Sequence, residues 1–272
     1  MKKLEYFITN KRIPYNQKLK YLIVIPCVNR EERNAINIID KTFESFEKSG
    51  MFESEINVDI LLFESGSKDL SYLNSIQKYN DKVNIKIAYS SIVLNGNTNT
   101  HRMFLYLSKL KEDLYDFVIW MDDDIYVCKN FIKNADIWIK NYANYSLFSS
   151  LYVPYDSFSI KNRNYVKLAN LPGFYGTCCT IFKPKLSMYV TPSWNDYHFE
   201  KFNYNPDARF RDCLRKYFPM AHKICVSHPS LVQHMNIGSA IKGETVVKKG
   251  HFTNNFIGVD NDPELYIHDI YT

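Results

Sequence analysis

Three consecutive carboxylates, Asp122, Asp123 and Asp124, follow a short apolar segment, residues 117–121. Like charges held within a few ångströms of one another cost free energy unless a cation or strong hydrogen-bond donors balance them. Carboxylate oxygens are ligands that Mg²⁺ and Mn²⁺ prefer, and an ion bound there would neutralise the charge of a departing diphosphate. The pattern therefore predicts a divalent-metal site, with a solvated acidic turn or a helix N-terminus as the alternative.

The segments that would position this cluster alternate between buried strands and helices. Apolar, β-rich runs over 21–26, 58–63 and 117–121 are typical of buried parallel strands. Helical spacing over 29–48 separates the first two runs, which predicts a βαβ unit. Further helices are expected over 70–79, 101–110, 131–142 and 208–217, and further strands over 83–89, 146–153, 178–182 and 223–227. Open α/β sheets bind ligands at the carboxyl ends of their strands, which is where the aspartates begin.

The strand followed by Asp122, Asp123 and Asp124 resembles the DxD motif of GT-A glycosyltransferases. The resemblance implies an α/β fold with a Rossmann-like nucleotide-binding half, a mixed and mainly parallel sheet flanked by helices, and an acceptor-binding half. In similar enzymes the last aspartate of the motif binds the metal, a role carried here to Asp124. In those enzymes the first aspartate of the motif meets ribose or metal-bound water, and the resemblance implies this role for Asp122. Asp123 could assist in either role.

Other segments resemble the same family in the same order. The first expected strand ends at Pro26 and is followed by Asn29 and Arg30, which look like the nucleotide loop of the family. Glu64, at the end of the second strand, stands where similar enzymes contact the nucleoside. The segment Ser230 to His234 looks like the C-terminal histidine segment that completes the metal site in many GT-A enzymes. A glutamine and histidine followed by glycine and serine are similar to the N-acetylglucosaminyltransferase IV family.

An inverting transferase needs a carboxylate that removes a proton from the acceptor hydroxyl. Asp212, which opens an expected helix, resembles the acidic catalytic position of the family and is the first candidate, with Asp207 as the alternate. The competing interpretation of Asp212 is a surface ion pair with Arg209 or Arg215.

Two cations and several aromatic residues are weaker candidates. Arg102 and Lys242 could contact a diphosphate, and the segment around Lys242 could form a flap that closes over the donor. Tyr175, Trp194 and Tyr197 could stack on sugars in the acceptor region, or lie in the core.

The composition favours one α/β domain of 272 residues, with a nucleotide half over 1–125 and an acceptor half with a flap over 126–272. The 34 Lys and Arg against 29 Asp and Glu, without concentrated basic runs, make stable nucleic-acid binding unexpected. The six cysteines lack zinc-site spacing, and no run is long enough for a membrane helix. These features predict a cytoplasmic protein. Because similar enzymes of the secretory pathway normally carry a membrane anchor, the resemblance implies a bacterial or viral enzyme, or a trimmed catalytic domain.

The sequence therefore predicts a transferase that uses Mn²⁺ or Mg²⁺ and a nucleotide-sugar donor. The resemblance implies a UDP-sugar, with UDP-GlcNAc as one candidate, and an inverting displacement, although retention stays open. The acceptor is a glycan, lipid, protein or nucleobase. The alternatives are a catalytically silent carbohydrate- or nucleic-acid-binding module of the same fold, and a sugar-phosphate nucleotidyltransferase. The latter would favour a glycine-rich basic loop after the first strand, which residues 27–33 lack.

Overall fold

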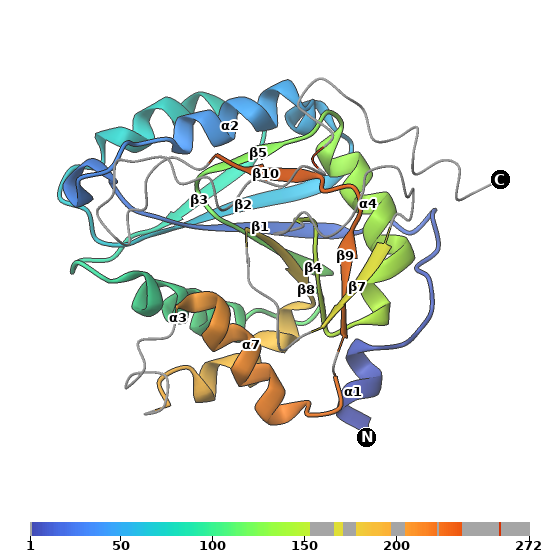
Figure 1. The fold of residues 1–272 in the computed structure, drawn as a ribbon. Helices are drawn as coiled ribbons and strands as arrows, with labels where there is room; N and C mark the ends of the chain where they lie inside the picture. Colours follow the sequence, from blue (N-terminus) through green and yellow to red (C-terminus); the bar gives the residue numbers. More distant parts are fainter. Residues whose placement is uncertain are drawn as a thin grey trace.

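The computed structural model describes residues 2–152, 166–170, 178–196, 205–221, 223–235 and 256 (Figure 1). Its centre is an eight-stranded sheet with the strand order β3-β2-β1-β4-β8-β6-β9-β7, and a separate two-stranded sheet pairs β10 with β5. The strands are β1 (Lys20–Cys27), β2 (Asn57–Glu64), β3 (Asn84–Ala88), β4 (Phe117–Met121), β5 (Ile125–Val127), β6 (Phe148–Ser150), β7 (Val166–Asn170), β8 (Cys179–Phe182), β9 (Lys223–Ser227) and β10 (Val232–His234).

Four of the seven pairings in the large sheet are parallel, namely those of β1 with β2, β1 with β4, β2 with β3 and β6 with β9. The pairs β4–β8, β6–β8 and β7–β9 are antiparallel. Because β8 runs against β4, the beginning of β8 lies beside the end of β4. This topology confirms the predicted α/β architecture, a mixed and mainly parallel sheet flanked by helices.

Helices cover both faces of the sheet, with α2 on one face and α3 and α7 on the other (Figure 1). The α-helices are α1 (Lys2–Phe7), α2 (Ile39–Lys48), α3 (Gly96–Leu107), α4 (Phe131–Tyr142), α5 (Ser187–Val190) and α7 (Pro206–Tyr217). Short 3₁₀ segments are η1 (Glu31–Arg33), η2 (Met51–Glu53), η3 (Ser71–Tyr79), η4 (Ala143–Tyr145), η6 (Pro184–Leu186) and η7 (Thr191–Ser193).

The alternation of side chains along the central strands builds two cores. Ile23 of β1 packs with Phe43 of α2 in the core on one face. Val24 packs with Phe104 of α3 and Phe210 of α7 on the other. Strand side chains point alternately to opposite faces, so a strand covered by helices on both sides is apolar throughout. This explains why the first strand reads as an unbroken apolar run.

Two helices begin at different places from those predicted. The helix expected over 29–48 begins only at Ile39, because the preceding η1 ends at Arg33 and the next residue, Asn34, has a left-handed backbone (φ 56°) that interrupts the helical path. The helix expected over 101–110 begins earlier, at Gly96. Asn95 caps it through a side-chain oxygen that accepts a hydrogen bond from the Thr98 amide at 2.8 Å.

Two further elements differ in kind from the predictions. The helix expected over 70–79 is the 3₁₀ segment η3, and β7 lies within a stretch that reads as polar loop. Among the described residues, no helix has the length and apolarity needed to cross a lipid bilayer.

Candidate functional site

The three aspartates leave the sheet at the carboxyl end of β4, a fully buried strand. The chain then forms β5, which pairs in antiparallel fashion with β10 and sets Ile125 opposite His234. This pairing brings Nε2 of His234 to 3.2 Å from Oδ1 of Asp124. The Met235 amide also donates to the Asp124 carbonyl at 2.8 Å. The structure thus brings together Asp124 and His234, two of the three residues predicted as metal ligands with Asp122, from segments far apart in the chain.

Side chains of α2 fix the backbone that carries the aspartates. The Thr42 hydroxyl donates to the Asp123 carbonyl at 2.8 Å and accepts from the Ile125 amide at 3.1 Å. Thr42 itself is wholly buried. The buried face of α2 therefore holds the turn between β4 and β5, which limits how far the carboxylates can move.

Arg30 is the positive charge inside this cluster. Its Nη2 lies 2.5 Å from Oδ1 of Asp123 and 2.8 Å from Oδ2 of Asp124, and its Nε donates to Oδ2 of Asp123 at 3.3 Å. The Arg30 side chain is 6% exposed. The sequence predicts Arg30 as a residue of the nucleotide loop, whereas the structure commits its guanidinium to the two aspartates.

The three carboxyl groups have different electrostatic surroundings. Burial raises the pKa of Asp122 well above its ordinary value, and the charges of Asp124 and Asp207 raise it further. Burial also raises the pKa of Asp123, against the opposing effect of Arg30. For Asp124 burial acts in the same direction, but His234 and Arg30 outweigh it and lower the pKa. A cation placed among these groups would stabilise all three in their charged forms.

The residues present fit a divalent metal ion. Oδ1 of Asp124 is buried and has no hydrogen-bond partner among the described residues. A carboxylate of Asp122, the Cys178 sulfur and a ring nitrogen of His234 lie within 4.8 Å of one another. Three carboxylates exceed the single guanidinium by two charges when all are ionised, which matches a divalent cation. Carboxylate, imidazole and thiolate are all metal ligands in proteins.

The two candidate bases of α7 have different surroundings. Asp207 lies in the first turn of the helix, where the helix dipole favours negative charge, and its own charge raises the pKa of Asp122 and of Cys178. Asp212 follows five positions later, which is about 140° around the helix. Its carboxylate accepts from Arg211 at 2.7 and 3.0 Å and from Arg215 at 3.4 Å. Asp207, the alternate, thus acts electrostatically on the aspartate cluster. Asp212 has the ion-pair arrangement, with the expected Arg215 and with Arg211 in place of Arg209.

Glu64 shapes the loop after β2. It is 1% exposed, and its carboxylate accepts from the Gly66 amide at 2.7 Å, from the Ser67 amide at 3.0 Å and from the Ser67 hydroxyl. Nearby, the Asn29 amide donates to the Ser67 hydroxyl oxygen at 2.8 Å, which joins the loops after β1 and β2. The carboxylate of Glu64 therefore holds the loop after β2, and its predicted contact with the nucleoside stays a prediction.

Arg102 is also committed to the fold. Its Nη2 donates to the carbonyls of Glu64 and Ala88, each at 2.7 Å, so it joins the ends of β2 and β3. Arg102 therefore bridges two strand ends, and its predicted contact with a diphosphate stays a prediction. Pro26 lies half-buried in β1, opposite Phe63 of β2.

Of the predicted aromatic contacts, only Trp194 can be placed. It is wholly buried, and its indole nitrogen donates to the Asn97 carbonyl at 3.0 Å. Trp194 is thus a core residue and not a surface on which a sugar can stack. Lys242, Tyr175 and Tyr197 lie outside the described residues.

Two residues of the site had not been predicted from the sequence. Thr42 is hidden in an amphipathic helix, where a buried threonine gives no functional signal. Cys178 reaches the site because β8 pairs with β4, setting Cys179 opposite Met121. The apolar strand expected over 178–182 is a usable signal, but only if its neighbour in the sheet is known.

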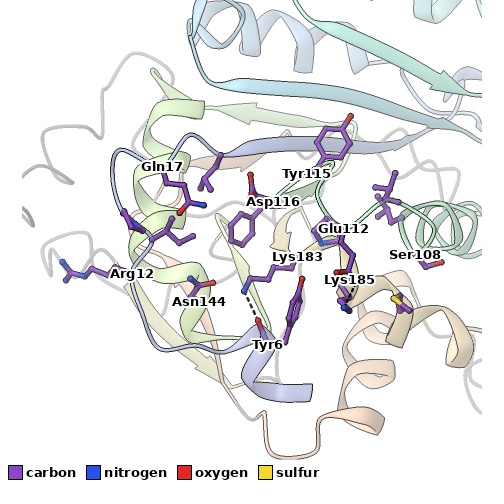
Figure 2. Close-up of a pocket in the computed structure, with 18 residues that line it drawn as sticks. Tyr6, Arg12, Gln17, Ser108, Glu112, Tyr115, Asp116, Asn144, Lys183 and Lys185 are labelled. Carbon is purple, nitrogen blue, oxygen red and sulfur yellow. Dashed lines mark hydrogen bonds and ion pairs between the residues drawn. The ribbon is translucent and has the colours of Figure 1, made fainter. Parts of the chain in front are cut away.

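A separate pocket of about 400 Å³ lies at the other end of the same strands (Figure 2). Leu19, just before β1, and Phe117, at the start of β4, line it. Lys183 donates to the Tyr6 carbonyl at 3.0 Å, and Lys185 pairs with Glu112 at 2.5 Å. Because the aspartates follow the opposite end of β4, this pocket is not part of the candidate metal site.

No protein-family model and no curated protein matches the chain. Among solved structures, S. aureus TarS in complex with UDP is similar over 93% of this chain and 63% of that chain, with 14% identity and a TM-score of 0.49. The mannosyltransferase PcManGT from Pyrobaculum calidifontis, in complex with GDP-Man and Mn²⁺, is similar over 88% of this chain and 60% of that one, with 11% identity and a TM-score of 0.48.

The galactosyltransferase LgtC, in complex with donor and acceptor sugar analogues, is similar over 76% of this chain and 73% of that chain, with 10% identity and a TM-score of 0.40. The chain thus spans less than two thirds of TarS and of PcManGT. Likenesses this remote carry no argument about substrate or mechanism, which must come from the site itself.

Proposed function

We propose that this chain is a metal-dependent glycosyltransferase that moves a sugar from a nucleotide-sugar donor to an acceptor hydroxyl. The observation that carries the proposal is the group of carboxylates at the end of β4, joined by His234 and including a buried Asp124 oxygen without a hydrogen-bond partner. Such a group at the carboxyl edge of a parallel sheet is suited to hold a cation against a phosphorylated ligand.

Asp124 and His234 would hold the ion, and Asp122 would either complete its ligands or orient the ribose. A divalent ion in this position, Mn²⁺ or Mg²⁺, supplies positive charge for the nucleoside diphosphate as it leaves. Arg30 has a different task. Because its guanidinium is bonded to Asp123 and Asp124, it opposes the protonation of these two carboxyls that burial favours, and it orients Asp124.

Asp207 is our candidate for the general base. It lies in the first turn of α7, and its charge raises the pKa of Asp122, so it is near enough to the aspartate cluster to serve an acceptor bound there. In an inverting displacement it would accept the proton of the acceptor hydroxyl as that oxygen attacks the anomeric carbon. The carboxylate of Asp212, held by Arg211 and Arg215, is less available for this transfer.

The finer assignments concern the donor and the acceptor. We favour a UDP-sugar donor, with a hexose or an N-acetylhexosamine such as GlcNAc as the transferred group. The acceptor would be a glycan, lipid, protein or nucleobase hydroxyl or amine. The nucleoside would lie against the joined loops after β1 and β2, where Asn29 and Ser67 fix the backbone.

Two alternatives are disfavoured by particular contacts. A sugar-phosphate nucleotidyltransferase needs free cations in the first loop for a triphosphate, but Arg30 is bonded to two aspartates. A silent binding module would not need four acidic groups held near one another at a cost in electrostatic repulsion.

The test is hydrolysis of a donor panel, namely UDP-GlcNAc, UDP-glucose, UDP-galactose and GDP-mannose, with Mn²⁺, Mg²⁺ or EDTA. We expect release of a nucleoside diphosphate from one donor, abolished by EDTA and reduced at least about 100-fold in Asp124→Asn. Asp40→Asn is the matched control, because Asp40 lies on the surface of α2 and its side chain is 38% exposed. Absence of both turnover and metal-dependent donor binding would favour the silent module.

A further inference from the structure

Cys178 lies among the candidate metal ligands, but it would supply sulfur, whereas the aspartates supply oxygen and His234 supplies nitrogen. Its sulfur, a carboxylate oxygen of Asp122 and a ring nitrogen of His234 are all within 4.8 Å of one another. The thiol is within hydrogen-bonding reach of the Asp122 carboxylate, and the Asp122 amide donates to the Cys178 carbonyl at 3.3 Å. The residue is 6% exposed.

The backbone, not a chance rotamer, sets this position. Strand β8 pairs with β4 in a register that places Cys179 opposite Met121, so the preceding Cys178 comes beside Asp122. Cys179, the next residue, is wholly buried in β8. Successive side chains of a strand point to opposite faces, so the two thiols differ in their access to the site.

A second observation points independently to a cation at this place. Oδ1 of Asp124 is buried, has no hydrogen-bond partner among the described residues, and lies 3.2 Å from Nε2 of His234. A buried carboxylate oxygen without a partner is costly unless a positive charge completes its surroundings. The thiol, the imidazole and two carboxylates therefore surround one region, in which Arg30 pairs with Oδ2 of Asp124 and leaves Oδ1 without a hydrogen-bond partner among the described residues.

We propose that Cys178 is a sulfur ligand of the divalent ion, so that this site selects thiophilic metals. The inference rests on the metal site of the proposed function and adds a ligand to it. As the sulfur–metal bond forms, the thiol gives up its proton to water and the sulfur binds as thiolate. A set of oxygen, nitrogen and sulfur ligands suits Zn²⁺ and Co²⁺, whereas Mg²⁺ and Mn²⁺ favour oxygen. The site is thus expected to bind Co²⁺ and Zn²⁺ more tightly than a site of oxygen and imidazole ligands would.

The test is titration of the whole chain with Co²⁺, followed by absorption spectroscopy, because a thiolate bound to Co²⁺ gives a sulfur-to-metal charge-transfer band. The wild type and the control Cys179→Ser are expected to show this band. Cys178→Ser is expected to lose it and to bind Co²⁺ about 10- to 100-fold more weakly. Mn²⁺ affinity, measured by competition, is expected to change far less, which also shows that the variant is folded.

The wild-type spectrum tests the inference even if a variant fails to fold. Co²⁺ binding without a charge-transfer band, or a band that persists in Cys178→Ser, would overturn the role of Cys178 and leave the metal site of the proposed function standing. A wild-type chain that binds neither Co²⁺ nor Mn²⁺, with or without UDP, would overturn both. Binding of Co²⁺ with a band that Asp124→Asn weakens would support both.

Discussion

The guanidinium of Arg30 lies 2.5 Å from the carboxylate of Asp123, and the two side chains are only 6% and 10% exposed. The same guanidinium reaches Asp124 at 2.8 Å. A buried charge without a partner is far more costly than the pair itself is stabilising, because the remaining ion stays out of water. Arg30 therefore supplies the positive charge that opposes protonation of two adjacent buried carboxylates.

Arg30→Gln is expected to lower the free energy of unfolding by about 3 kcal/mol, the cost of removing one partner of a buried pair. Denaturant unfolding measures this change in the free energy of unfolding. Arg215→Gln is the control, because that side chain is 51% exposed and its pairing with Asp212 should contribute less than about 1 kcal/mol. Equal effects of the two substitutions would mean that Arg30 is not the counterion of the cluster.

Gly66 is expected to tolerate no side chain. Its φ is +84°, and an added Cβ would lie 2.0 Å from the Ile92 carbonyl oxygen. Gly50 has a similar φ of +73° but nothing within 4 Å of an added Cβ, which makes Gly50→Ala a matched control for backbone strain alone. We expect Gly66→Ala to lose at least about 1 kcal/mol more stability than Gly50→Ala, with weaker nucleotide binding. If thermal unfolding shows equal losses of stability for Gly66→Ala and Gly50→Ala, the close approach of residue 66 to the Ile92 carbonyl is refuted.

Glu64→Gln is expected to destabilise the protein by about 1–3 kcal/mol, because an amide nitrogen would face the amides of Gly66 and Ser67. Binding of UDP and binding of GDP, each measured by calorimetry, should weaken by the same factor. The reason is that the substitution disturbs the loop and not a contact with the base. Glu53→Gln, on a side chain that is 59% exposed, is the control. A change in preference between the two nucleotides at unchanged stability would instead support a direct nucleoside contact.

Asp207 and Asp212 can be separated by kinetics. Asp207→Asn is expected to lower kcat by about 100- to 10,000-fold, the usual contribution of a general base, while Mn²⁺ and UDP still bind. Asp212→Asn should keep activity within a few-fold, because its carboxylate serves the Arg211 and Arg215 pairs. The reverse pattern would restore Asp212 as the base.

Those parts of the site that depend on local pattern were predictable from the sequence. The strand over 117–121 and the helix over 131–142 have the predicted bounds, because an unbroken apolar run and helical spacing are local signals. The position of the aspartates at the end of β4 followed from them. The closeness of His234 to Asp124 agrees with the expected ligand pair, although only the resemblance to a family suggested it.

Contacts between distant segments could not be read from the sequence in the same way. Arg30 meets Asp123 across 93 positions, and Cys178 meets Asp122 only because β8 runs against β4. The sequence around Glu64 and Arg102 gives no indication that the polar groups of these two side chains form hydrogen bonds within the fold. A side chain that closes a loop and one that binds a ligand have the same residue type, so burial and bonding partners are needed to distinguish them.

The most direct test of the metal site is anomalous diffraction from crystals grown with Mn²⁺ and UDP. The account predicts one strong peak between Asp124, Asp122 and His234, at about 2.0–2.3 Å from their ligand atoms, with the diphosphate oxygens on its open side. A peak elsewhere on the protein, or UDP bound with no metal among these residues, would contradict the account.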